Sequence, residues 1–104
     1  LSLAQDGLID ACLAQDDIAA ARAASDRHVE LATRLGATEG LFSALTRAAR
    51  VALAEGDPAR ARTFLTEAQP HADALDRSRH RNAYNANLDE VRAKLAALEA
   101  ETSR

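Results

Sequence analysis

The stretch LAQDDIAAAR, Leu13–Arg22, returns forty residues later as LAEGDPARAR, Leu53–Arg62. Both copies have the pattern of a helix end, a polar turn and a new helix start. Asp17 and Asp57 stand where a carboxylate caps the first N–H groups of the new helix. A helix pair of this length cannot bury its apolar stripe alone. The duplication therefore predicts an all-α stack of antiparallel helix-turn-helix repeats.

Turn residues divide the rest of the chain into helices. Gly36 suits the left-handed conformation just beyond a helix end. Pro58 suits a first helical position, because its missing N–H leaves no bond unmade there. Between the turns, apolar residues recur every three or four positions. The pattern predicts five helices, at about residues 2–14, 18–35, 38–55, 58–75 and 79–101, of which the last is the longest.

The apolar faces of the second and fourth predicted helices correspond position by position. The matched residues are Ala21, Ala24, Ser25, His28, Ala32 and Leu35 with Ala61, Phe64, Leu65, Ala68, Ala72 and Leu75. The register of the duplication therefore persists beyond the turn. The fifth predicted helix has its own apolar stripe at steps of four and three, made of Tyr84, Leu88, Val91, Leu95 and Leu98.

Composition limits the class of protein. A chain of 104 residues suffices for one domain, and its many alanines and leucines favour helix over sheet. The net charge of −3, with acidic and basic residues interleaved, argues against nucleic-acid binding. No apolar run reaches the roughly 20 residues that span a bilayer, and the single cysteine, Cys12, suits a reducing compartment. We expect a cytoplasmic domain, and Leu1 in place of an initial Met indicates a fragment of a longer protein.

These features resemble a tetratricopeptide-like (TPR-like) repeat of the long variety, with a period near 40 residues. Ala21 and Ala61 resemble the small residue that this family uses for close helix contact, and Gly56 with Asp57 resembles its Gly-Asp turn. The Leu-Gly and Leu-Ala-x-Gly-Asp phrases are similar to repeats of bacterial signal-responsive transcription regulators of the maltose-activator type. The resemblance implies about two and a half repeats and a protein or peptide partner.

In this family the first helix of each unit lines the concave face, so the resemblance implies a groove along the first, third and fifth helices. Arg47 and Arg50 would bind an acidic side chain or a C-terminal carboxylate there. The alternative is a row of solvated or mutually paired surface charges. The predicted groove residues are Asp6, Asp10, Ser43, Thr46, Arg47, Arg50 and Asp89. Leu95 and Leu98 would contact a second copy in a homodimer.

Other polar residues have two interpretations each. His28 is either a core histidine with one hydrogen bond or, together with Tyr84, a pH-sensitive or ligand-contacting group. The basic cluster at 77–81 is a solvated helix start rather than a nucleic-acid site, because no further basic or aromatic residues extend it. No metal-ligand spacing, cofactor motif or nucleophile with a plausible base occurs. We therefore expect no metal, no cofactor and no enzymatic activity.

The sequence thus predicts a protein-protein interaction or oligomerisation module of a bacterial regulatory protein, without direct contact to nucleic acid or membrane. One alternative is a small-molecule sensor domain whose ligand lies between helices near His28 and Tyr84, and another is a structural spacer. A sensor requires a cavity with convergent polar groups, whereas a scaffold requires an exposed apolar or charged strip.

Overall fold

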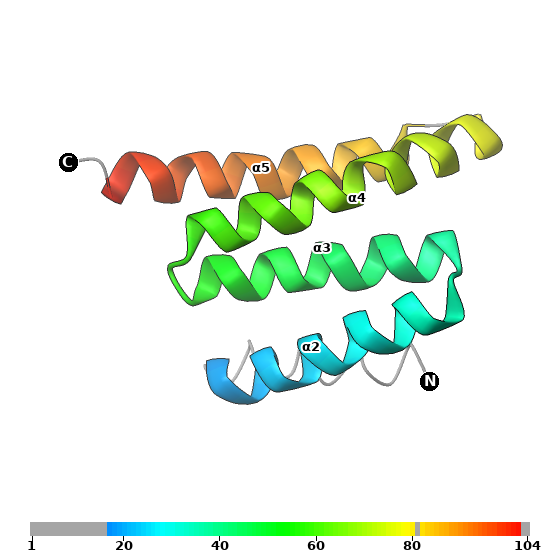
Figure 1. Cartoon of the computed structure of the whole chain (residues 1–104). Helices are drawn as coiled ribbons and strands as arrows, with labels where there is room; N and C mark the ends of the chain where they lie inside the picture. Colours follow the sequence, from blue (N-terminus) through cyan, green and yellow to red (C-terminus); the bar gives the residue numbers. More distant parts are fainter. Residues whose placement is uncertain (1–16, 81, 103–104) are drawn as a thin grey trace.

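The computed structural model describes residues 17–80 and 82–102 as four α-helices and their connections. The helices are α2 (Ile18–Leu35), α3 (Thr38–Ala54), α4 (Pro58–Arg79) and α5 (Ala83–Thr102). They lie side by side in chain order, with alternating direction (Figure 1). The described ranges contain no strand, so the all-α prediction is confirmed for them. The helix predicted at residues 2–14 lies outside the described residues.

Two copies of one turn begin α2 and α4. The side chains of Asp17 and Asp57 each accept a hydrogen bond from the backbone N–H three residues later, at 3.2 and 3.1 Å. Both residues are therefore N-caps, a role worth about 1 kcal/mol. Each cap is followed four residues later by a fully buried alanine, Ala21 or Ala61.

The junction between α4 and α5 differs from the prediction. α4 continues through residues 76–79, and α5 begins at Ala83. α4 is therefore the longest described helix, with 22 residues against 20 in α5, and the predicted order of lengths is wrong. The residue that ends α4 is His80, in the left-handed conformation at φ 52°, with its N–H donating to the Asp76 carbonyl. Glycine usually occupies such a position, so a histidine gave no stop signal.

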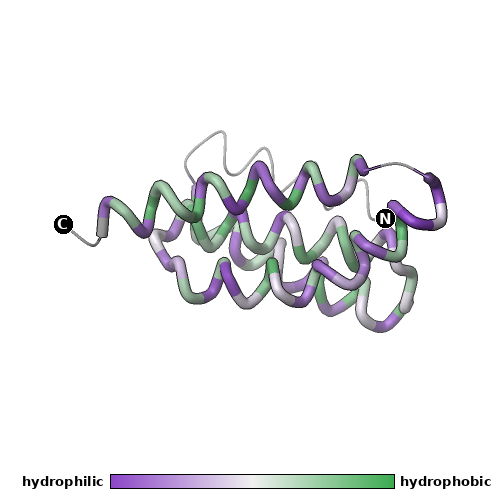
Figure 2. The backbone as a smooth tube through the Cα atoms, turned by 90° about the horizontal axis from the view of Figure 1, so that it is seen from above, coloured by the Kyte–Doolittle hydropathy of each residue, from purple (hydrophilic) through white to green (hydrophobic). Residues whose placement is uncertain are grey.

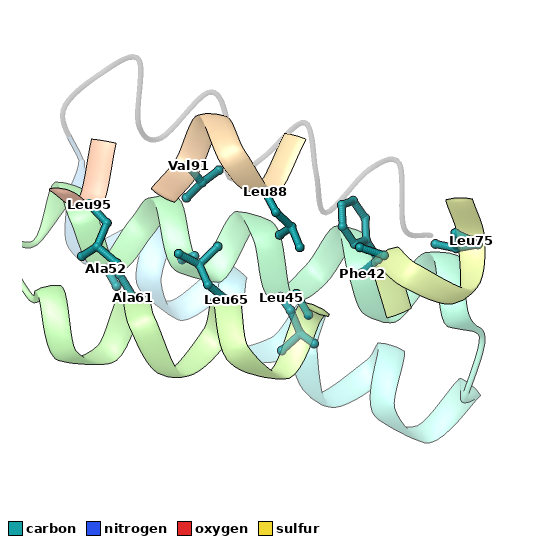
Figure 3. Packing of buried hydrophobic residues seen from close by; sticks show 12 residues of the cluster. Phe42, Leu45, Ala52, Ala61, Leu65, Leu75, Leu88, Val91 and Leu95 are labelled. Carbon is teal, nitrogen blue, oxygen red and sulfur yellow. The ribbon is translucent and has the colours of Figure 1, made fainter. Parts of the chain in front are cut away.

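The main core lies between α3, α4 and α5 (Figure 3). At one end Leu95 of α5 lies beside Ala52 of α3 and Ala61 of α4, whose small side chains allow the helices to approach closely. The cluster continues through the middle of the bundle to Phe42 and Leu75 at the other end. A smaller cluster joins α2 to α3 and consists of Ala21, Ala24 and Val51.

Polar and apolar residues alternate along each helix (Figure 2), as expected where one face of a helix packs on its neighbours. Two positions of the predicted apolar stripes differ. Leu35 is 65% exposed because α2 ends directly after it at Gly36. Its counterpart Leu75 is buried in the main core, and α4 continues for another turn beyond it. Phe64 is only half-buried, and the guanidinium of Arg60 lies 5.2 Å from the centre of its ring.

Candidate binding surface

Three of the predicted groove residues form a polar strip on α3, defined as Ser43, Arg47 and Arg50. They are spaced by four and three residues, so they share one face of the helix, and all three are half-buried. Arg47 Nη1 donates to Ser43 Oγ at 3.2 Å. The strip is therefore partly ordered by its own hydrogen bonds.

Thr46 does not belong to this surface. Its side chain is only 2% exposed, and its hydroxyl donates to the Phe42 carbonyl at 2.6 Å. The hydrogen bond satisfies the hydroxyl within the helix, so the residue can be buried among apolar neighbours. The prediction that Thr46 lines a groove is wrong for this arrangement. Asp6 and Asp10 lie outside the described residues.

Asn87 of α5 extends the polar strip across the helix interface. Arg50 Nη2 donates to Asn87 Oδ1 at 3.1 Å, and both side chains are half-buried. Sequence reasoning missed Asn87 as a site residue. The available signal was its position next to Leu88 at the border of the apolar stripe of α5, where a polar side chain can reach a neighbouring helix.

Asp89, predicted in the groove, lies on the opposite flank of α5. Its carboxylate is 3.7 Å from Arg92 Nη1, and the other Nη of Arg92 donates to Gln69 on α4. Residues two positions apart on a helix point about 200° away from each other. Asn87 therefore points toward α3 and Asp89 toward the outer side of α4, so Asp89 does not join Arg50.

The densest polar contacts of the described chain hold the start of α5. The carboxylate of Asp76, 7% exposed, accepts hydrogen bonds from the N–H groups of Tyr84 and Asn85, both at 2.9 Å, and from Asn85 Nδ2 at 2.8 Å. The first N–H groups of a helix have no acceptor within it. A residue of α4 thus caps α5.

The basic cluster at 77–81 was assigned to the start of the last helix, and that assignment is wrong. Arg77 and Arg79 belong to the last turn of α4, where positive charge interacts favourably with the helix dipole. Arg79 also donates to Glu39 of α3 at 2.6 Å. This hydrogen bond and the charge of Glu39 hold the pKa of the Arg79 guanidinium above its ordinary value.

Tyr84 is half-buried and forms part of the same junction. Its ring meets that of Phe42 edge-on, with centroids 5.0 Å apart. Its hydroxyl accepts a hydrogen bond from Arg79, whose guanidinium carbon lies 5.5 Å from the ring centre. These contacts give Tyr84 a structural role in joining α3, α4 and α5.

His28 and Tyr84 do not meet. His28 is 1% exposed in α2. Among the described helices, α2 packs against α3, whereas α5 packs against α3 and α4. The part of the chain that the structure describes contains no pocket. A ligand contacting both residues is therefore not supported by their placement.

The predicted dimer contacts are also placed differently. Leu95 is buried in the core of the chain itself, beside Ala52 and Ala61, so it is not available to a second copy. Leu98 is half-buried. The described residues contain no group of three or more histidine, cysteine or acidic side chains arranged to hold a metal ion. None of the described helices combines the length and apolar character needed to cross a membrane.

Comparison with known proteins gave no match: no family model, no curated protein and no solved structure is similar to this chain.

Proposed function

We propose that this chain is a protein-binding module, a TPR-like helical repeat that binds a protein or peptide partner through the face shared by α3 and α5. The observation that carries the proposal is the polar strip of Ser43, Arg47 and Arg50, which Asn87 continues onto α5. These side chains are half-buried on helices whose other contacts are mainly alanine and leucine. A partly desolvated polar strip fixed by a rigid scaffold suits the recognition of a peptide.

Contacts that recur with the duplication support the repeat. Arg22, five residues after the cap Asp17, donates to Glu55 just beyond the end of α3 at 3.1 Å. Arg62, five residues after the cap Asp57, donates to Glu99 in the last turns of α5. The start of the second helix in each unit is thus tied to the end of the helix that follows it. The same ion pair in two successive units favours a stacked repeat over an unrelated bundle.

The context of a cytoplasmic bacterial regulatory protein is part of the proposal and depends only on the Leu-Gly and Leu-Ala-x-Gly-Asp phrases. The small-molecule sensor has no comparable support, because His28 and Tyr84 are on helices that do not pack together. A homodimer would have to use residues other than Leu95.

Selection of peptide ligands from a displayed random library, with affinities then measured by fluorescence anisotropy, tests the proposal. We expect the double substitution R47E and R50E to lower the affinity for the selected peptides at least tenfold. The matched control is R27E with R77E, which makes the same change of charge at two exposed arginines on α2 and α4. Far-UV circular dichroism verifies that both double variants fold. If the R47E and R50E variant does not fold, the double variant R47Q and R50Q replaces it. Failure to select any peptide would refute the assigned face. An equal loss of peptide affinity in the two double variants would also refute it.

A further inference from the structure

The corner between α4 and α5 reverses the chain without a glycine. Its left-handed residue is His80, with φ 52°, whereas the corners after α2 and α3 use Gly36 at 69° and Gly56 at 74°. In this conformation the Cβ of any residue other than glycine comes too close to the following carbonyl oxygen. Closing the corner after α4 therefore has a backbone cost that the two glycine corners do not have.

The sequence of the same corner does not stop a helix. Residues 80–82 are His-Arg-Asn and include neither glycine nor proline, whereas Gly56 and Pro58 interrupt the chain between α3 and α4. All three side chains are tolerated inside a helix. The local sequence therefore permits α4 to continue into α5 as one helix, and the reversal depends on contacts with the rest of the fold.

The cap formed by Asp76 is one contact that stabilises the reversal. Its carboxylate accepts the N–H groups of Tyr84 and Asn85, both at 2.9 Å. These groups need an acceptor outside the helix only because α5 starts anew after the corner. In a continuous helix they would donate to the carbonyls four residues earlier. The backbone cap therefore stabilises the closed corner and is not needed in a joined helix.

The other contacts of α5 do not involve the corner. Leu88, Val91 and Leu95 are buried in the core between α3, α4 and α5 (Figure 3), and Glu99 accepts a hydrogen bond from Arg62 of α4. Among the described helices, α5 packs against α3 and α4 alone. The α3 and α4 helices of a second copy could make all of these contacts in the same way.

We infer that two copies of this chain exchange α5. In the dimer the corner is open, α4 and α5 form one helix, and the α5 helix of each copy packs on α3 and α4 of the other. The exchange keeps the core contacts and relaxes His80 in both copies, and these gains oppose the entropy lost on association. Short connections under strain favour such exchange. Leu95, which two closed chains cannot share through their surfaces, keeps its core position in the exchanged dimer.

The arrangement of the helices is compatible with this exchange. α4 and α5 lie side by side in opposite directions (Figure 1). Two joined helices that lie antiparallel, with their open corners adjacent, therefore place each α5 along the α4 helix of the other copy. The face shared by α3 and α5 occurs twice in such a dimer, each time with α3 from one copy and α5 from the other.

Light scattering after size-exclusion chromatography measures the exchange in the 104-residue chain, unfolded in urea and refolded over a series of concentrations. Refolding is used because the corner opens only when α5 leaves its own core. We expect a dimer whose fraction rises with the concentration at refolding. H80G should raise the dimer dissociation constant at least about tenfold, because glycine relaxes the closed corner and disfavours the joined helix in both copies. H80A keeps the Cβ and favours helix, so it should lower that constant.

D76A tests the closed corner without changing its backbone. It should lower the dimer dissociation constant about tenfold, because the closed corner loses its cap and the joined helix does not need one. D73A removes an exposed carboxylate of the same helix and should stay within about twofold of the unmodified chain. Equal dissociation constants for H80G and D76A would overturn the inference, and so would monomers at every concentration in all variants.

Cross-linking distinguishes the exchange from an association of closed chains. Arg62 and Glu99 form an ion pair between α4 and α5, so in the exchanged dimer each of these positions lies beside the other in the second copy. One chain carries R62C and the other E99C, and both carry C12S. A short bismaleimide should join the two chains after they are refolded together. The control replaces R62C with T63C, at an exposed position about 100° around α4. A dimer without this cross-link, or with equal cross-linking of T63C, would show that closed chains associate through their surfaces and would overturn the inference.

Discussion

Replacing Asp76 with alanine would remove the acceptor that holds the first turn of α5. The carboxylate accepts two backbone N–H groups of α5 at 2.9 Å and the Asn85 amide at 2.8 Å. Loss of a capping side chain costs about 0.5–2 kcal/mol, and hydrogen bonds to charged groups contribute about 1.5–3 kcal/mol. Tyr84 and Asn85 are half-buried, so water can replace part of what is lost. We expect the free energy of unfolding to fall by about 2–3 kcal/mol.

For a domain of this size, such a loss lowers Tm by roughly 10–20 °C. Urea unfolding followed by far-UV circular dichroism measures the free energy, and hydrogen exchange locates the effect. The amides of Tyr84 and Asn85 should exchange much faster in D76A, with a smaller change at Val91 in the middle of α5.

Asp73 provides the matched control for D76A. It is exposed and accepts hydrogen bonds only from side chains, those of Gln69 at 2.8 Å and Asn85 at 3.2 Å. D73A should therefore cost less than about 1 kcal/mol. If D76A and D73A differ by less than about 0.5 kcal/mol, or if exchange at Tyr84 is unchanged in D76A, the assignment of Asp76 as the cap of α5 is wrong.

Three further substitutions test the packing and the backbone, each by urea unfolding. H80G should stabilise the chain by about 0.5–1 kcal/mol, because φ at His80 is 52° and glycine has no Cβ penalty there; a loss of stability would contradict this. L88A should cost about 2–5 kcal/mol because Leu88 is fully buried, whereas L35A should change stability by less than about 0.5 kcal/mol. A61L should lower the free energy of unfolding by about 1–3 kcal/mol through overpacking. The control is A59L, at an exposed alanine of the same helix. Equal effects of the two substitutions would show that α4 does not need a small residue at position 61.

The helix starts that depend on nearby residues were predicted to the residue. α2, α3 and α4 begin at residues 18, 38 and 58 as expected, and the caps of α2 and α4 are Asp17 and Asp57, immediately before the helices. The start of α5 was misplaced because its cap, Asp76, belongs to another helix. A capping residue that the fold brings into place leaves no local spacing for the sequence to reveal.

The candidate site shows the same division between local and tertiary information. The common face of Arg47 and Arg50 follows from their spacing on one helix. Thr46 and Asp89 do not belong to the candidate site because of the way the neighbouring helices pack on α3 and α5. The helical period of the sequence does not predict which flank of a helix its neighbours cover. Asn87 was missed for the same reason, since its role depends on the approach of α5 to Arg50.

The side chains of α2 and α4 show what a duplicated register preserves. Ser25 and His28 in α2 correspond to Leu65 and Ala68 in α4, and all four are buried. In each helix one of the two positions, one turn apart, holds a small side chain and the other a large one, but their order is exchanged. Close packing constrains the space available to neighbouring side chains together rather than each residue separately. Compared position by position, His28 is a polar residue within an apolar stripe, whereas the comparison of pairs shows that it is the large member of its pair, as Leu65 is in α4.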